Sequence, residues 1–285
     1  MSERKNAKEH ERVIDHCLIF DVDGVLTDPQ TKEVTDPAGL TLLAERLRKD
    51  EPIILNTGRA VDFILEKIMP KLSDDAGKDK LKNVLVVAEK GGVVLLYNDQ
   101  GEPQIVEDKS YSVPEEVHAQ VKELVAQKYG DTMFYDATKR TMLSVEMIDN
   151  GDLEKFGKAQ ERIIEDFKVT LTRAKIEKEF VIDPTIIATD IQHRDVGKAL
   201  GVRKALRWLG QQNVAPKEFL TFGDSTSDLP MAAELAKLGK PGKFIFVGEP
   251  QKISGVETEF PIVQTSDRFE QGVKEFLQSL NHSQS

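Results

Sequence analysis

The stretch Cys17-Leu18-Ile19-Phe20-Asp21-Val22-Asp23-Gly24-Val25 joins an apolar run to two aspartates and a glycine. The apolar run predicts a buried strand, and Gly24 marks the turn that ends it. Side chains two positions apart on a strand project to the same side, so Asp21 and Asp23 are expected to converge. Two carboxylates that lie so close repel each other unless a cation or a shared proton intervenes. The stretch therefore indicates a functional site, with an ordinary Asp-Gly turn as the alternative.

Strand and helix patterns alternate on both sides of this stretch. Further predicted strands are residues 52–55, 84–88, 219–222 and 243–247, and predicted helices are residues 39–49, 61–68, 201–209 and 230–238. Repeated strand–helix–strand units favour a parallel sheet with helices on its faces. We therefore expect an α/β fold, with a Rossmann-like, doubly wound parallel sheet.

A second pattern occupies the middle of the chain. Its predicted helices are residues 114–129 and 153–167, and its predicted strands are residues 132–135, 142–148, 169–172 and 179–191. Two helix–strand–strand units in succession favour an antiparallel sheet with helices on one face. We expect residues 1–97 and 192–285 to form one core, interrupted by an α+β insert at residues 98–191.

The composition limits the kinds of molecule that we expect the protein to bind. The chain has 285 residues, with 39% hydrophobic and 31% charged side chains and a net charge of −10. Such a charge argues against nucleic acid, which needs clustered Lys and Arg. No apolar stretch approaches the roughly 20 residues that span a bilayer, and the N-terminus has no secretory pattern. The single cysteine, Cys17, allows no internal disulfide. We expect a cytoplasmic protein, and no heptad pattern predicts an oligomer. The negative charge does not argue against a small phosphorylated substrate, because one bound cation and a few basic residues reverse the field locally.

Small polar and acidic residues follow three of the predicted core strands. They are Asp21 and Asp23, Thr57 and Gly58, and the run Gly223-Asp224-Ser225, while Lys198 opens the helix that follows the insert. Ligands of open parallel sheets bind beyond the carboxyl ends of the strands. Each feature alone is ordinary, because such residues also make turns, helix caps and solvated surface. Their joint placement predicts phosphoryl transfer through an aspartyl-phosphate.

This chemistry gives each group a role. Mg²⁺ prefers oxygen ligands, which the carboxylates of Asp21 and Asp224 and the backbone carbonyl of Asp23 would supply. Asp21 would be the nucleophile, and Asp23 would act as general acid and then as general base. Lys198, the Thr57 hydroxyl and backbone amides near Gly24 and Gly58 would stabilise the charge on the transferring phosphoryl group.

The chain resembles phosphatases of the haloacid dehalogenase superfamily. The first motif of that superfamily is similar to Asp21-Val22-Asp23-Gly24-Val25, the second to the strand that ends in Thr57-Gly58-Arg59, and the fourth to Gly223-Asp224-Ser225-Thr226-Ser227-Asp228. The third motif is a lysine, for which Lys198 is our prediction and Lys204 the alternative. The resemblance implies that Asp224 binds the metal directly. It also implies that Asp228 supports the metal site or Lys198 without binding the metal directly.

The insert at residues 98–191 resembles the cap of the branch that contains sucrose-, trehalose- and mannosylglycerate-phosphate phosphatases. Such a cap closes over the core and contacts the leaving group. The predicted substrate contacts are Arg59, Glu89, Lys90 and Gly91 from the core and Lys139, Arg140 and Glu146 from the insert. Solvated surface charge is the alternative interpretation of the charged residues among them.

The resemblance implies a Mg²⁺-dependent phosphatase that acts on a small phosphorylated metabolite, above all a sugar or glycosyl phosphate. Three alternatives stay open. A phosphomutase of the phosphomannomutase type would share the core and the cap, and a nucleotide or cofactor phosphatase would use the same chemistry on another leaving group. A binding protein on a retained fold would lack turnover altogether.

Overall fold

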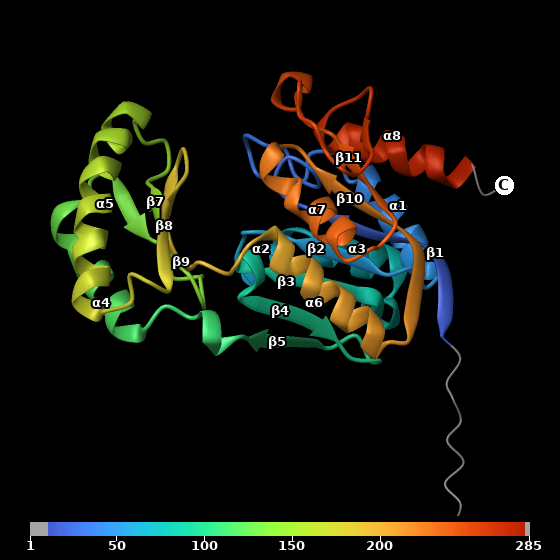
Figure 1. The fold of residues 1–285 in the computed structure, drawn as a ribbon, viewed down its shortest axis with the longest axis horizontal. Coiled ribbons are helices and arrows are strands. Elements are labelled where there is room, and N and C mark those ends of the chain that lie inside the picture. The colour runs from blue at the N-terminus through green and yellow to red at the C-terminus, as the bar shows by residue number, and fades with distance from the viewer. Residues whose placement is uncertain (1–10, 283–285) are drawn as a thin grey trace, which may run out of the picture.

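The computed structural model describes residues 11–282, which form a larger and a smaller unit (Figure 1). The larger unit holds an eight-stranded sheet in the order β12-β11-β10-β1-β2-β3-β4-β5. Its strands are β1 (Arg12–Phe20), β2 (Ile53–Asn56), β3 (Val84–Ala88), β4 (Val93–Tyr97), β5 (Pro103–Glu107), β10 (Val214–Gly223), β11 (Gly242–Phe246) and β12 (Ile262–Gln264). All pairs from β12 to β3 are parallel, whereas β3, β4 and β5 pair antiparallel.

Helices cover both faces of this sheet, which confirms the doubly wound α/β core. They are α1 (Ala38–Arg48), α2 (Val61–Lys67), α3 (Met69–Ala76), α6 (Lys198–Gln211), α7 (Pro230–Lys237) and α8 (Phe269–His282). Alternate residues of β1 face opposite sides, as the pleat requires. Leu18 and Phe20 pack with α1, α3 and α8, whereas Cys17 and Ile19 pack with α6 and α7. The central strands are therefore buried on both faces.

The smaller unit has its own core. Its sheet has the order β6-β7-β9-β8 and consists of β6 (Met133–Tyr135), β7 (Leu143–Met147), β9 (Ala188–His193) and β8 (Phe180–Pro184). The helices α4 (Glu115–Lys128) and α5 (Leu153–Ala174) lie side by side on one face (Figure 1). Leu143 and Val145 point toward these helices. Ser144 and Glu146 alternate with them, so they belong to the opposite face of the sheet.

The insert differs from the prediction at both borders. The segment Pro103–Glu107, which we assigned to the insert, is strand β5 and pairs with β4 in the core sheet. Val113 is the first residue that packs in the smaller core, and β9 ends at His193. We therefore propose to place the inserted unit, called the cap from here on, at residues 113–193.

Two cap elements also differ. The predicted strand at residues 169–172 is the last turn of α5, because Leu171 continues the buried stripe of Ile163 and Phe167. The β-branched residues there favour a strand locally, but packing of the apolar face decides the outcome. The single predicted strand at residues 179–191 is a hairpin of β8 and β9. The elements β5, α3, β12 and α8 were not predicted. Among residues 11–282, no helix is long and apolar enough to cross a membrane.

Candidate active site

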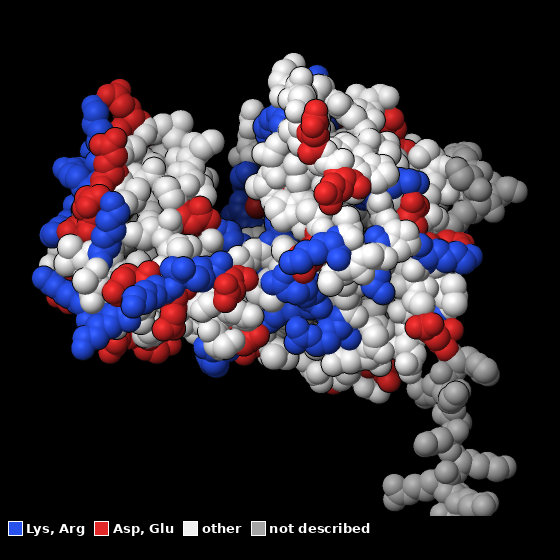
Figure 2. Space-filling model, viewed as in Figure 1, with Lys and Arg blue, Asp and Glu red and all other residues white. Residues whose placement is uncertain are grey.

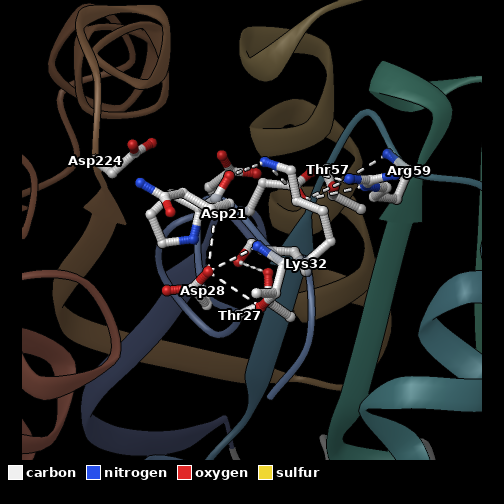
Figure 3. Close-up of polar contacts among 12 residues, drawn as sticks. Asp21, Thr27, Asp28, Lys32, Thr57, Arg59 and Asp224 are labelled. Atoms are coloured by element: carbon white, nitrogen blue, oxygen red, sulfur yellow. Dashed lines mark hydrogen bonds and ion pairs between the residues drawn. The ribbon is translucent and has the colours of Figure 1, made fainter. Parts of the chain in front are cut away.

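The predicted site residues meet at the carboxyl ends of three neighbouring strands. Asp21 follows β1, Thr57 follows β2 and Asp224 follows β10. Because β1 pairs in parallel with both neighbours, the three strand ends lie at one edge of the sheet. Figure 3 shows Asp21 in the middle, with Asp224 on one side and Thr57 on the other. This edge is where open α/β sheets bind their ligands.

Lys198, the first residue of α6, holds the centre of the site together. Its Nζ lies 2.5 Å from Asp21 Oδ1 and 2.9 Å from Asp228 Oδ1, and it donates to the Asn56 carbonyl at 2.8 Å. Asn56 Nδ2 donates in return to the Lys198 carbonyl at 2.9 Å, which fixes the start of the helix. Lys204 instead pairs with Asp108 at 2.9 Å. The lysine at the site is therefore Lys198.

Burial changes the pKa values of the charged groups at this centre. Burial raises the pKa of Asp21 to about 8, and although Lys198 opposes this effect, the carboxylates of Asp228 and Asp23 add to it. Burial lowers the pKa of Lys198, but Asp21 and Asp228 outweigh it and raise that pKa above its ordinary value. Lys198 therefore stays charged. Its single positive charge does not balance the negative charges of the neighbouring carboxylates.

The arrangement of carboxylates fits a divalent cation. One oxygen from each of Asp21, Asp224 and Asp228 lies within 4.8 Å of the others. Burial and repulsion by Asp228 raise the pKa of Asp224. Three carboxylates facing one buried ammonium leave an excess of negative charge, which a hard cation with oxygen ligands would neutralise. Gly24 makes this approach possible, because a Cβ there would lie 2.8 Å from the Asp224 carboxyl group.

Asp228 takes a supporting place in this cluster. Its side chain is fully buried, and Oδ2 accepts from Ser225 N at 3.3 Å and Ser225 Oγ at 3.2 Å. The other oxygen faces Lys198. Asp21 and Asp224 are 14% and 15% exposed, so these two carboxylates are the ones of the cluster that a cation can reach.

Asp23, the predicted acid and base, is held by an arginine. Arg59 Nε and Nη2 donate to the two Asp23 oxygens at 2.9–3.1 Å (Figure 3). The guanidinium also lies 4.7 Å from the centroid of the Phe63 ring. Burial lowers the pKa of Arg59, but the Asp23 carboxylate outweighs this and raises it. Arg59 thus contacts a predicted catalytic group, which the sequence analysis did not foresee.

The loop after β2 brings the remaining predicted phosphate contacts to this edge. Thr57 is fully buried, and its hydroxyl accepts from Arg59 N at 3.1 Å. The Gly58 carbonyl accepts from Lys139 Nζ of the cap at 2.8 Å. The contact places a cap ammonium beside the loop that is predicted to bind phosphate.

Glu89 and Gly91 do not have the substrate-binding position that we predicted. Glu89 is 1% exposed, and its carboxylate accepts from the backbone N–H groups of Arg140, Thr141 and Met142 and from the Thr141 hydroxyl, at 2.8–3.2 Å. Gly91 has φ of +114°, and a Cβ there would lie 2.6 Å from Leu200. Glu89 therefore joins the cap to the core, whereas Gly91 lets its loop pack closely against the core helix α6. The prediction failed because a charged residue in a loop gives no local sign of being buried.

Two other predicted substrate contacts, Lys90 and Arg140, bridge the two units, between which Figure 2 shows a notch. Lys90 Nζ contacts Asp183 at 2.7 Å, Asp190 at 3.3 Å and Gln192 at 2.6 Å, all on the cap sheet. Arg140 lies 3.2 Å from Asp62. The cap and the core are therefore joined by charged contacts as well as by the Glu89 carboxylate.

A hollow of about 240 Å³ lies in this cleft beside Arg59. Its further lining residues are Ala60, Asp62, Phe63 and Glu66 from the core and Phe134, Asp136, Thr138, Lys139 and Glu146 from the cap. Burial raises the pKa of Glu146, although the nearby Lys139 opposes this effect. The hollow thus combines two aromatic rings with several carboxylates.

Sequence reasoning missed several residues of this region. Lys32 Nζ lies 3.9 Å from Asp23 Oδ1, and Lys252 Nζ lies 3.4 Å from Asp224 Oδ2. Phe63 from the core and Phe134 from the cap both line the hollow. Each of these residues stands in a stretch with no chemical motif, so only the folded chain brings them to the site.

No protein-family model and no curated protein matches the sequence. Among solved structures, the C-terminal domain of trehalose-6-phosphate phosphatase from C. albicans is similar at a TM-score of 0.65 and 18% identity, over 96% of this chain and 93% of that one. A haloacid dehalogenase-like hydrolase from Bacteroides thetaiotaomicron has a TM-score of 0.62 and 14% identity, over 94% and 100%.

A third similar structure is the ATP-bound IMP-nucleotidase from Plasmodium falciparum. It has a TM-score of 0.57 and 15% identity, and the match covers 96% of this chain and 61% of that one. At identities this low, the structural matches show the fold alone. The chain has the fold of capped haloacid dehalogenase-like hydrolases, as its motifs predicted.

Proposed function

We propose that the protein is a Mg²⁺-dependent phosphatase that hydrolyses a sugar or glycosyl phosphate through an aspartyl-phosphate on Asp21. The observation that carries this proposal is the contact of Lys198 with Asp21 and Asp228, next to Asp224. Asp21, Asp224 and the backbone carbonyl of Asp23 would hold the metal. Bound Mg²⁺ would keep Asp21 ionised and offset charge on the phosphoryl oxygens.

The residues of the chain divide the reaction between them. An Asp21 oxygen attacks phosphorus and forms an acyl phosphate, while the bond from phosphorus to the leaving oxygen breaks. Asp23 gives its proton to that oxygen and later takes one from the water that attacks phosphorus, which restores Asp21 and releases phosphate. Lys198 stabilises the charge of the transferring group from a fixed position. Arg59 orients Asp23 through two parallel hydrogen bonds.

The hollow in the cleft supports a sugar as the leaving group. Carboxylates such as Asp62, Asp136 and Glu146 accept hydrogen bonds from hydroxyl groups. The rings of Phe63 and Phe134 offer apolar faces on which a sugar ring packs. A volume of about 240 Å³ is below the range of roughly 300–1,000 Å³ that is usual for drug-sized ligands, which favours a small leaving group.

One observation favours a second candidate, a nucleotide phosphatase. Phe134 is 42% exposed at the cleft, and an exposed ring also stacks on a nucleobase. Phosphate release from a panel of sugar phosphates, nucleotides and phosphorylated cofactors, with Mg²⁺ and then with EDTA, separates the two. Mg²⁺-dependent release dominated by one glycosyl phosphate is the expected result. Dominant release from a nucleotide would reassign the substrate, and an isomeric sugar phosphate as product would indicate a mutase.

A further inference from the structure

A second hollow, of about 490 Å³, lies on the core between α6 and the β4–β5 hairpin. Helix α6 packs on α7 and on the strands β2, β3 and β10, so it covers the hairpin only in part. The floor is apolar and is formed by Leu85, Val94, Leu96, Val106 and Trp208. Val106 is 52% exposed there. The volume falls in the range of small-molecule sites.

The rim of this hollow carries an excess of positive charge. Its charged residues are Glu107, Asp108, Lys109, Lys204 and Arg207. Both acids are already paired, Glu107 with Lys109 at 2.5 Å and Asp108 with Lys204 at 2.9 Å. Arg207 has no hydrogen-bond or ion-pair partner within residues 11–282. Figure 2 shows Lys and Arg side chains gathered over α6, whereas the whole chain has a net charge of −10.

We propose that this hollow binds a small organic anion with an apolar body, such as a carboxylate on a short hydrocarbon chain. The anionic group lies between Arg207 and Lys204, and the apolar body covers Leu96, Val106 and Trp208. Guanidinium is suited to carboxylates because its donors match both oxygens. Burial of the exposed apolar floor supplies the remaining affinity.

The hollow lies at the base of the cap, so its occupant also acts on the linkers. Lys204 Nζ lies 5.4 Å from the ring centroid of Tyr111, in the segment that leads into the cap. Tyr111 in turn makes an edge contact of 5.2 Å with His193, the last residue of the strand that leaves the cap. An anion that draws Lys204 from Asp108 changes the contacts at both linkers. The hollow is therefore an effector site for cap position.

Trp208 provides the measurement, because it is the only tryptophan of the chain and lines the hollow. The fluorescence emission of Trp208 in the full chain is measured during titration with octanoate, octylammonium and octan-1-ol. Binding of each compound is also measured by calorimetry. We expect saturable binding of one octanoate per chain, at least tenfold tighter than binding of the cation or the alcohol. Hydrogen exchange at residues 107–113 should change with octanoate.

Matched variants on α6 separate this site from general surface charge. Arg207→Gln should weaken octanoate binding at least tenfold, whereas Arg203→Gln, whose arginine pairs with Glu234 at 2.9 Å, should leave it unchanged. Equal affinity for octylammonium, equal effects of the two substitutions, or no saturable signal in either assay would overturn the proposal. A dimer in sedimentation that Val106→Asp dissociates would also overturn it, by assigning the hollow to a second copy.

Discussion

Lys198 Nζ lies 2.5 Å from Asp21 Oδ1, and each side chain is 14% exposed. Asp21 precedes the cap in the sequence and Lys198 follows it. The two segments of the core must therefore pack together before this contact forms. A buried ammonium at this distance fixes the Asp21 carboxylate and offsets its charge. The catalytic part of the proposed function depends on this pair.

Removal of the Lys198 ammonium tests its role. Lys198→Met should lower kcat/KM by about 10²- to 10³-fold, because it removes a preorganised charge that stabilises the transition state. The comparison is Lys204→Met, whose lysine pairs with Asp108 away from the carboxylate cluster, so it should lower kcat/KM by much less than Lys198→Met does. Steady-state kinetics of both variants decides between them. A larger loss in Lys204→Met would give the motif to the other lysine.

In the proposed function, Arg59 positions Asp23 through its hydrogen bonds to both carboxylate oxygens. Arg59→Lys keeps the charge but loses the two-pronged contact, so kcat should fall about 10- to 100-fold while KM changes little. The pH profile of kcat should also shift, since the environment of the acid and base group changes. A variant with wild-type kcat and a raised KM would show that Arg59 binds substrate instead. Circular dichroism confirms that the variant is folded.

Glu89 joins the cap to the core. Glu89→Ala leaves the buried N–H groups of Arg140, Thr141 and Met142 without their acceptor, so the free energy of unfolding should fall by about 2–5 kcal/mol. Glu66→Ala, on the surface of α2, should cost less than about 0.5 kcal/mol. Urea unfolding of both variants measures the difference. Equal stability of the two would mean that Glu89 is not a clamp.

The cap carries a histidine whose charge opposes folding. Burial lowers the pKa of His118 below 6.5, and its Nδ1 lies 2.6 Å from the Tyr135 hydroxyl. The unfolded chain therefore binds the extra proton first, and the free energy of unfolding falls as the pH drops below the unfolded pKa. His118→Gln should reduce this fall between about pH 7.5 and about pH 5.5. The check is urea unfolding at several pH values, and parallel curves would contradict the prediction.

The sequence predicted the centre of the site because motif residues follow buried strands. Asp21, Thr57 and Asp224 each stand at the end of an apolar run, and parallel strands bring their ends to one edge. Lys198 was predicted from its place after the insert, and the structure puts it at the centre.

The outer residues of the site could not be predicted, because their positions depend on contacts between segments far apart in the chain. Arg59 on Asp23, Lys32 near Asp23 and the Glu89 carboxylate under the cap arise only when separate loops pack together. The strand predicted at residues 169–172 failed for a related reason, because the buried stripe that ends at Leu171 outweighs local preference. Local patterns predict elements, whereas long-range packing decides which charged side chains are buried.

The aspartyl-phosphate on Asp21 is tested by comparing the wild-type chain with Asp21→Asn. The two proteins are mixed with Mg²⁺ and the best substrate of the panel, and phosphate release is followed together with acid-quenched mass spectrometry of the peptide that contains Asp21. We predict Mg²⁺-dependent release and a phosphoryl adduct on that peptide in the wild type, and neither in the variant. Turnover by Asp21→Asn at a rate close to that of the wild type would show that Asp21 is not the nucleophile.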